Sequence, residues 1–253
     1  YFARSRCFVI VVYRSWESAK IRPMDKQQLS HNIAQLLSRV RRSAEKSQFS
    51  NSDILVVAVS KTRPASHIRW AHESGLSHFG ENYLQEALSK IDELKDLPLC
   101  WHFIGPIQSN KTISIAEHFD WVHSVDRDKI ARRLSDQRSP HKSPLQVCLQ
   151  VNVSGEDSKS GVTLAALPDL AKTVLALPGL NLRGLMAIPA AGSDEKQQRQ
   201  DFASMRAALS ELQALAPGLD TLSMGMSADL EAAIAEGATM VRVGTALFGP
   251  RNR

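Results

Sequence analysis

Several features that define other protein classes are missing from this sequence or scarce in it. The 253 residues include three cysteines with no CxxC pair, so the sequence predicts free thiols in a reducing compartment and no disulfide framework. No stretch approaches the roughly 18 apolar residues that a membrane-spanning helix needs. The eight histidines form no HExxH or HxH pattern and GxGxxG is absent, so neither a metal site nor a dinucleotide site is expected.

Positive charge is also scarce once the first 23 residues are set aside. The chain carries a net charge of +5, and residues 1–23 contribute +4 of it through five basic residues against one acidic residue. A nucleic-acid-binding domain carries its positive charge on the folded surface, so nucleic-acid binding is not expected. Residues 1–23 are interpreted as upstream sequence outside the natural protein or as a presequence, and residues 24–253 as one domain. The expected location is the cytoplasm, or the mitochondrion in the case of a presequence.

Helix and strand patterns alternate regularly through the rest of the chain. The β-branched run at residues 54–59 is typical of a strand buried on both faces of a parallel sheet, and an amphipathic helix is predicted before it over residues 25–47. Further strands are predicted at residues 78–80, 99–104, 121–124, 145–153, 182–188, 221–224 and 240–243. The helices between the strands are predicted at residues 67–75, 84–94, 111–118, 127–136, 164–177, 195–215 and 228–236.

Eight such units predict an α/β protein built as a single (β/α)8 TIM barrel. An open doubly wound sheet usually has five or six strands, and a barrel of about 250 residues would use the whole chain. The chain ends shortly after the eighth predicted strand. We therefore expect the last outer helix to be missing and the helix at residues 25–47 to cover its place.

A lysine follows the first predicted strand, at the end of the barrel where functional residues gather. Lys61 lies two and four residues after Val59 and Val57, so its side chain should point to the same face of the strand as theirs. Its amine is therefore expected to enter the barrel from this end. Burial makes a lysine amine nucleophilic toward an aldehyde, with which it forms a Schiff base. The alternative is a solvated lysine at a strand end, since lysine is seldom fully buried.

Small and polar residues follow the seventh and eighth predicted strands, where barrels commonly hold phosphate. Ser227, Gly244 and Thr245 are the candidates, although Ser227 would also serve as the N-cap of the next helix and Gly244 would also suit a tight turn. Arg242 has the parity of Gly244, so inside the barrel it needs a partner, either a pyridine nitrogen or a buried carboxylate. Together with Lys61 these residues indicate a phosphorylated aldehyde, either pyridoxal phosphate (PLP) or the sugar phosphate of a class I aldolase.

Longer segments narrow this choice because they follow one another in a specific order. They are AVSKT (58–62), FGENY (79–83), WHFIGPIQSNK (101–111), QVNVSGEDSKSG (150–161), GLMAIP (184–189) and LSMGMSADLEAAIAEGATMVRVGTALFG (222–249). Together they resemble the pyridoxal phosphate homeostasis protein family, from about residue 24 to the end of the chain. The resemblance implies a barrel like the N-terminal domain of alanine racemase, which is fold type III of PLP proteins.

The resemblance also implies a set of cofactor contacts. The implied cofactor-binding residues are Lys61, Asn82, Met226, Ser227, Arg242, Gly244 and Thr245. In this family Lys61 would hold PLP as an internal aldimine, and Arg242 would lie near the pyridine nitrogen. The phosphate contacts would come from Ser227, Gly244 and Thr245. Asn82 and Met226 would line the cofactor.

The function implied by the resemblance is that of a carrier or buffer of PLP. Members of the family are regarded as regulators of vitamin B6 and of amino-acid and keto-acid balance, without an established catalytic reaction. Apo-enzymes that use PLP are the implied recipients, and a bare barrel of this length is expected to be a monomer. The alternative is a PLP-dependent racemase or aldolase, but racemisation needs an acid or base on each face of the cofactor. Tyr83 is the only tyrosine after residue 23, and nothing in the sequence places it on the opposite face.

Overall fold

Eight parallel strands close into one barrel in the computed structural model of this protein, which describes residues 24–49, 53–156, 159–190 and 192–250. The strands are β1 (Leu55–Val59), β2 (His78–Glu81), β3 (Cys100–Phe103), β4 (Trp121–Val125), β5 (Leu145–Val151), β6 (Leu180–Ala187), β7 (Thr221–Ser223) and β8 (Met240–Val243). Each strand pairs with the next, and β8 pairs with β1 to close the ring. The predicted (β/α)8 barrel is therefore confirmed, whereas residues 1–23 lie outside the described residues.

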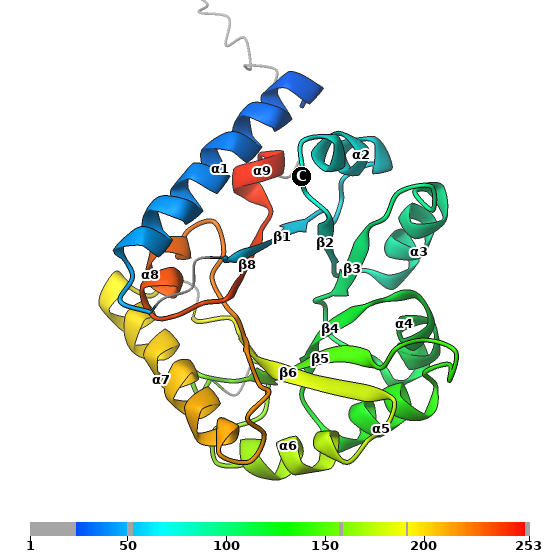
Figure 1. Ribbon diagram of the computed structural model, residues 1–253, viewed down its shortest axis with the longest axis vertical. Coiled ribbons are helices and arrows are strands. Elements are labelled where there is room, and N and C mark those ends of the chain that lie inside the picture. The colour runs from blue at the N-terminus through cyan, green and yellow to red at the C-terminus, as the bar shows by residue number, and fades with distance from the viewer. Residues whose placement is uncertain (1–23, 50–52, 157–158, 191, 251–253) are drawn as a thin grey trace, which may run out of the picture.

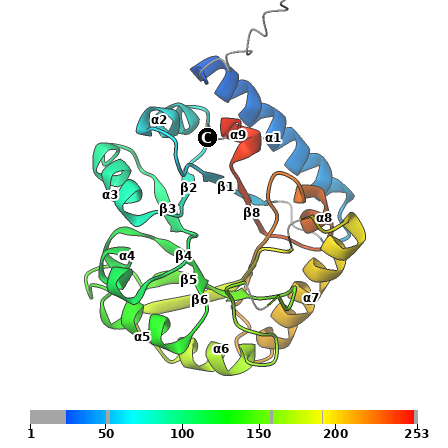
Figure 2. The same cartoon turned by 180° about the vertical axis from the view of Figure 1, so that it is seen from behind.

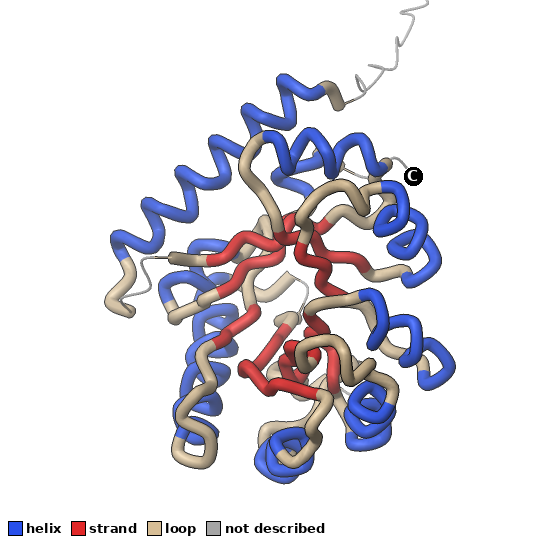
Figure 3. Tube along the Cα trace, turned by 45° about the vertical axis from the view of Figure 1, so that its right-hand side comes forward, coloured by secondary structure: helices blue, strands red, loops and turns tan. Residues whose placement is uncertain are grey.

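Helices surround the ring of strands (Figure 1), and the view from behind shows the same arrangement (Figure 2). The helices are α1 (Lys26–Lys46), α2 (Ala65–Glu73), α3 (Leu84–Glu93), η1 (Ser109–Lys111), α4 (Thr112–His118), α5 (Asp128–Asp136), α6 (Leu167–Leu175), α7 (Glu195–Gln213), α8 (Leu230–Ala235) and α9 (Thr245–Phe248). Figure 3 shows the strands in the middle and the helices outside them. None of the helices in the described part of the chain has the length and apolar character that crossing a membrane requires.

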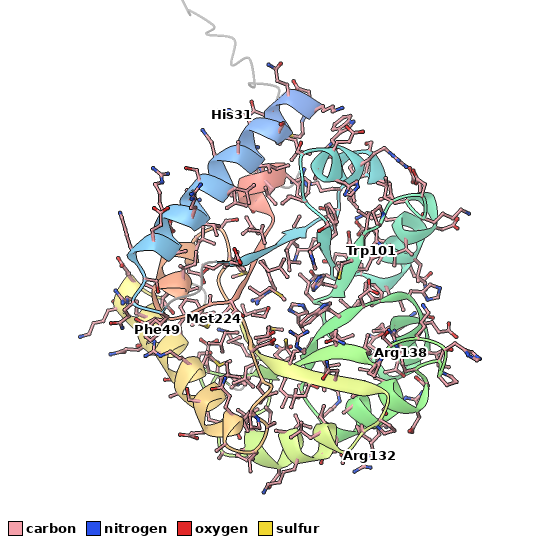
Figure 4. All side chains as sticks on the ribbon, viewed as in Figure 1. His31, Phe49, Trp101, Arg132, Arg138 and Met224 are labelled. Atoms are coloured by element: carbon pink, nitrogen blue, oxygen red, sulfur yellow. The ribbon has the colours of Figure 1, made fainter. Side chains whose placement is uncertain are left out.

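Alternation along the strands sorts side chains between two apolar layers. In β1, Val56 and Ala58 belong to the large cluster that packs strands against helices, whereas Val57 belongs to a smaller cluster inside the barrel. The buried members of this inner cluster are Val57, Trp121, Cys148, Met186 and Met240. Figure 4 shows side chains filling the space that the strands enclose. The prediction that the first strand is buried on both faces is confirmed.

The first helix closes the outer ring in the expected place. Four apolar residues of α1 recur at helical spacing and are buried, namely Leu29, Ile33, Leu36 and Val40. Asn32 on the same helix donates a hydrogen bond to the carbonyl oxygen of Leu247, 2.8 Å away. The expectation that no helix follows β8 was wrong, because the four-residue helix α9 begins at Thr245. One turn leaves most of this side of the barrel to α1, which lies beside α9 and α8 (Figure 1).

Candidate functional site

A cavity of about 290 Å³ lies at the carboxyl ends of the strands. The residues that line it are Val59, Lys61, Arg63, Asn82, Ile104, Ile188, Met226, Ser227, Ala228, Arg242, Gly244, Thr245 and Gly249. All seven residues that the sequence singled out are among them. The structure thus brings together residues from the ends of β1, β2, β7 and β8 in one place.

The backbone turns sharply immediately after Lys61. Thr62 has a φ of 63°, which is a conformation that β-branched residues rarely adopt and that costs on the order of 1–3 kcal/mol. The backbone N–H of Thr62 donates to the Glu86 carboxylate at 2.6 Å, which holds the turn in place. Lys61 lines the cavity, which places it at the end of the barrel where the sequence expected it.

A buried ion pair fixes the other side of Lys61. The Lys90 ammonium donates to the carbonyl oxygen of Ser60 and to the Glu81 carboxylate, each at 2.8 Å, and to Glu86 at 2.5 Å. The Ser60 hydroxyl donates to the same Glu81 oxygen at 2.7 Å. Burial raises the pKa of Glu81, and the neighbouring ammonium opposes that rise. The residues on both sides of Lys61 are therefore anchored to α3.

Arg242 is buried and extends its guanidinium toward the ends of β6 and β7. It donates to the carbonyl oxygen of Ser223 at 2.5 Å, to the Ser223 hydroxyl at 2.8 Å and to the carbonyl oxygen of Ala187 at 2.9 Å. These acceptors differ from the buried carboxylate that the sequence left open as a partner. Burial lowers the pKa of Arg242 to about 10, which still leaves it positively charged at neutral pH.

A line of histidines continues inward from Ser223. The Ser223 hydroxyl lies 2.7 Å from His123 Nδ1, His123 Nε2 lies 2.9 Å from His102 Nδ1, and His102 Nε2 lies 2.9 Å from His78 Nδ1. Burial lowers the pKa values of His102 and His123 well below 6.5, so both are neutral. We call His78, His102, His123 and Ser223 the histidine chain. It links Arg242 to the opposite end of the barrel.

Ser227 has a different partner from the one expected. The structure places Asp229, not Ser227, at the N-cap position of α8. The Asp229 carboxylate accepts the backbone N–H of Met226 at 2.5 Å, which forms a turn before the helix. The Ser227 hydroxyl instead accepts the backbone N–H of Ala246 at 3.2 Å. This contact joins the loop after β7 to α9, which follows β8, and both regions carry residues proposed for phosphate.

Asn82 owes its position to a close backbone approach. A Cβ added at Gly105 would lie 2.3 Å from the carbonyl oxygen of Asn82, so a glycine is needed at that position. The side-chain oxygen Oδ1 of Asn82 is buried and makes no hydrogen bond within the described residues. A buried polar atom of this kind calls for a partner, and its residue lines the cavity.

Two groups of residues around the cavity carried no local signal in the sequence. Arg63 lines the cavity and donates to the carbonyl oxygens of Gly249 and Pro250 at 2.7 and 2.8 Å. Its partners lie at the far end of the chain, so no local spacing indicates them. The contacts of Lys90 with Ser60 and Glu81 likewise join a helix to two strand ends, and only the closed barrel brings them together.

The lining of the cavity fits a small anionic aldehyde. Its charged residues are Lys61, Arg63 and Arg242, and the described lining includes no aspartate or glutamate. Its volume is near the lower end of the roughly 300–1,000 Å³ of small-molecule sites. PLP carries a phosphate, an aldehyde and polar ring substituents, so it matches the positive charge, the lysine amine and the unpaired Asn82 oxygen.

Comparisons with known proteins agree with this geometry. The alanine racemase N-terminal domain family matches residues 24–252. The pyridoxal phosphate homeostasis protein of Pseudomonas aeruginosa is 60% identical over 224 residues, which cover 88% of this chain and 96% of the relative. The chain belongs to the pyridoxal phosphate homeostasis protein family.

Solved structures place the pyridoxal phosphate homeostasis protein family among related barrels. PipY of Synechococcus elongatus, whose structure has PLP bound, is 40% identical, with a TM-score of 0.77 over 88% of this chain and all of that chain. Alanine racemase from Corynebacterium glutamicum is 14% identical, with a TM-score of 0.69 over 90% of this chain and 62% of that chain. The second likeness shows the fold alone, and it confirms the alanine-racemase-like barrel that the sequence predicted.

Proposed function

We propose that this protein binds PLP in the cavity and carries or buffers it, as a contributor to vitamin B6 and amino-acid homeostasis. The observation that carries the proposal is the convergence of Lys61 with Ser227, Gly244 and Thr245 on one positively charged cavity. PLP, when bound, supplies an aldehyde that a lysine amine can hold covalently. The family membership and the PLP-bound structure of PipY support the same ligand.

In this proposal each of the seven candidate residues has a stated role. Lys61 holds the aldehyde carbon, and its neighbours are anchored by Lys90 and Glu86, which keeps the amine directed into the cavity. The phosphate contacts Ser227, Gly244 and Thr245, in the position after the seventh and eighth strands where barrels bind phosphate. The remaining contacts are assigned to Arg242 at the pyridine nitrogen and to Asn82 and Met226 along the ring.

The titratable residues of the lining favour a carrier over a racemase. Racemisation needs proton donors or acceptors on both faces of the cofactor. Of the described lining residues, Lys61 is the one side chain of a type that commonly serves as a general acid or base, since the others are two arginines and uncharged residues. Tyr83 is 53% exposed and does not line the cavity.

The wider setting of the carrier is also proposed. Apo-enzymes that use PLP are the recipients, and the protein acts as a monomer, as expected for a bare barrel of this length. The cytoplasm suits Cys100 and Cys148, which are both unpaired. Light scattering of the purified protein measures the oligomeric state, and a dimer as the main species would contradict the monomer.

The test of PLP binding is covalent trapping. Purified protein is incubated with PLP, its absorbance is recorded, and borohydride reduction is followed by peptide mass mapping. We expect one pyridoxyl group, on Lys61. Lys61→Ala should lose the adduct and keep its fold, whereas Lys172→Ala, which removes a lysine that is well exposed on α6, should behave like the wild type. An adduct on several surface lysines would contradict the proposed site.

A second measurement separates the carrier from the racemase. Holo-protein is incubated with single amino acids in deuterated water, and exchange at the α carbon is followed over time. The carrier proposal predicts no sustained exchange. Continued turnover would show that the barrel is an enzyme.

A further inference from the structure

A second cluster of ligand-type side chains lies inside the barrel, away from the cavity. Among the described residues, one group of three His, Cys, Asp or Glu side chains brings its ligand atoms within 4.8 Å of one another: His78, Cys100 and His102. None of the three lines the cavity at the carboxyl ends of the strands. The cluster therefore lies apart from the cavity, to which the histidine chain connects it through Arg242.

Strand register produces the cluster. His78 is paired with Cys100 where β2 meets β3, and His102 follows Cys100 by two residues, so both β3 side chains point to the same face. That face is the inside of the barrel, because His102 stacks on Trp121 of the inner cluster at 5.5 Å between ring centres. His78 and Cys100 are partly exposed, which gives an ion a route to the site.

The distances suit a tetrahedral ion with sulfur and nitrogen ligands. Bond lengths of Zn²⁺ to cysteine sulfur and histidine nitrogen imply separations of about 3.5 Å between S and N and about 3.3 Å between N and N. Cys100 Sγ lies 3.5 Å from His102 Nε2, which matches the first value. His78 Nδ1 lies 2.9 Å from His102 Nε2, so a shift of a few tenths of an ångström in the partly exposed His78 would match the second.

Outer contacts orient the buried ligand. His102 Nδ1 lies 2.9 Å from His123 Nε2, and this contact fixes the ring so that Nε2 faces His78 and Cys100. Zinc-binding histidines commonly have a partner of this kind on the second ring nitrogen. Burial and, to a lesser extent, the nearby Asp120 carboxylate raise the pKa of Cys100 to about 12, so the ion must displace the thiol proton to bind the sulfur. The carboxylate accepts the backbone N–H of Trp101 at 2.8 Å, and its negative charge favours a cation beside it.

We propose that His78, Cys100 and His102 bind a divalent ion of the zinc class through two imidazole nitrogens and one thiolate. The Cys100 S–H bond breaks as the sulfur–metal bond forms, and the proton passes to solvent. The two histidines donate lone pairs from Nδ1 of His78 and Nε2 of His102, with their protons on the other ring nitrogens. Three protein ligands leave one coordination position for water.

Local sequence patterns do not indicate this site, because its ligands come from two neighbouring strands whose register is set by the barrel. The short Cys-x-His spacing of Cys100 and His102 is the part of the signal that the sequence contains.

The test uses Co²⁺ as a spectroscopic probe. The full chain is reduced, freed of metal by a chelator and titrated with Co²⁺, and Zn²⁺ is then added to displace the cobalt. We expect one equivalent to bind, with visible ligand-field bands of a tetrahedral ion and a sulfur-to-cobalt charge-transfer band. Cys100→Ser should lose the charge-transfer band and weaken Zn²⁺ binding by more than tenfold.

Cys148→Ser is the matched control. Cys148 is also a free cysteine inside the barrel, but it is outside the group of ligand atoms. This variant should keep the bands of the wild type. In wild-type protein, one equivalent of Zn²⁺ should also protect Cys100 from alkylation, as read by peptide mapping, which needs no variant to fold. Absence of stoichiometric cobalt binding, or a charge-transfer band that persists in Cys100→Ser, would overturn the proposal.

Discussion

The two ends of the barrel use the same strands for different purposes. Along β8, Met240 packs in the inner cluster, and Gly244, just beyond the carboxyl end, lines the cavity. Along β1 the same order runs from Val57 to Lys61. The strand period of two keeps these residues on one face, so a step of four residues changes a packing position into a ligand position. Stability at one end and chemistry at the other thus follow from position along the strand.

The ends are not fully separate, because the histidine chain runs between them. It begins with His78 beside Cys100 and ends at Ser223, which accepts a hydrogen bond from Arg242. A polar line through the inside of a barrel is costly unless every member has a partner. Each member has one here, so the comparison between the ends can be tested with substitutions at either side.

The largest effect should come from Lys90→Ala. A large loss of stability in this variant would show that residues at the carboxyl end of the barrel, and not only those of the inner cluster, stabilise the fold. Removal of the ammonium leaves the Glu81 carboxylate buried without its cation, which costs about 3–5 kcal/mol of unfolding free energy. Urea unfolding measures this loss. PLP retention should fall as well, because Ser60 loses its anchor beside Lys61.

Two further variants serve as controls for Lys90→Ala. Lys95→Ala removes an exposed lysine whose ion pair with Asp92 is 3.5 Å long, and it should change stability by less than about 0.5 kcal/mol. Replacing both partners in Glu81→Leu/Lys90→Met should recover most of the loss, since no buried charge is left unpaired. A Lys90→Ala protein as stable as Lys95→Ala would show that the ion pair contributes nothing.

Two methionines, one in the inner cluster and one in the cavity, allow the two ends of the barrel to be compared directly. Met186 is buried in the inner cluster, so Met186→Ala should cost about 2–5 kcal/mol of unfolding free energy and leave PLP affinity nearly unchanged. Met226 is 38% exposed and lines the cavity, so Met226→Ala should weaken PLP binding with little loss of stability. Denaturation and PLP titration of both variants measure the two quantities. Equal losses of affinity would mean that the two ends are not distinct.

Gly105→Ala should have an intermediate effect at the carboxyl end. The new Cβ would lie 2.3 Å from the carbonyl oxygen of Asn82, so the loop after β2 must shift. We expect a loss of about 1–3 kcal/mol together with weaker PLP binding. Gly218→Ala is the control, because a Cβ there meets no atom within 4 Å. Unchanged PLP affinity in Gly105→Ala would show that the position of Asn82 does not matter for the ligand.

The smallest effect is the pH dependence that Glu81 imposes. Because burial raises its pKa, the folded protein keeps this proton to a higher pH than the unfolded chain, in which the pKa is near 4.5. The contribution of protonated Glu81 is full below that pH and declines as pH rises through the folded value, by up to about 1.4 kcal/mol per pH unit. The stability of the wild type relative to Glu81→Gln should decline as the pH rises from about 4.5 through the folded pKa of Glu81. Parallel curves between pH 4 and 8 would contradict the assignment.

Local patterns predicted the fold well because each unit of the barrel is local. The run at residues 54–59 and the amphipathic stretch at residues 25–47 need no knowledge of distant partners, and β1 and α1 match them within one residue. Strand parity placed Lys61 and Arg242 inside the barrel for the same reason. Contacts between units were out of reach, as the N-cap assigned to Ser227 illustrates. Its partner, Ala246, becomes a neighbour only when the loop after β7 meets α9.

The packing of α1 against α8 and α9 has a consequence for folding during synthesis of the chain. The helix is translated early, but Glu231, which pairs with Arg39, and Leu247, which accepts the hydrogen bond from Asn32, are translated late. At 5–20 residues per second the interval is on the order of 10–40 s. During that time the part of α1 that packs on α8 and α9, and the edge of β1 that pairs with β8, lack their partners. Closure of the barrel by β8 and the seating of α1 on α8 and α9 must therefore wait until the end of synthesis.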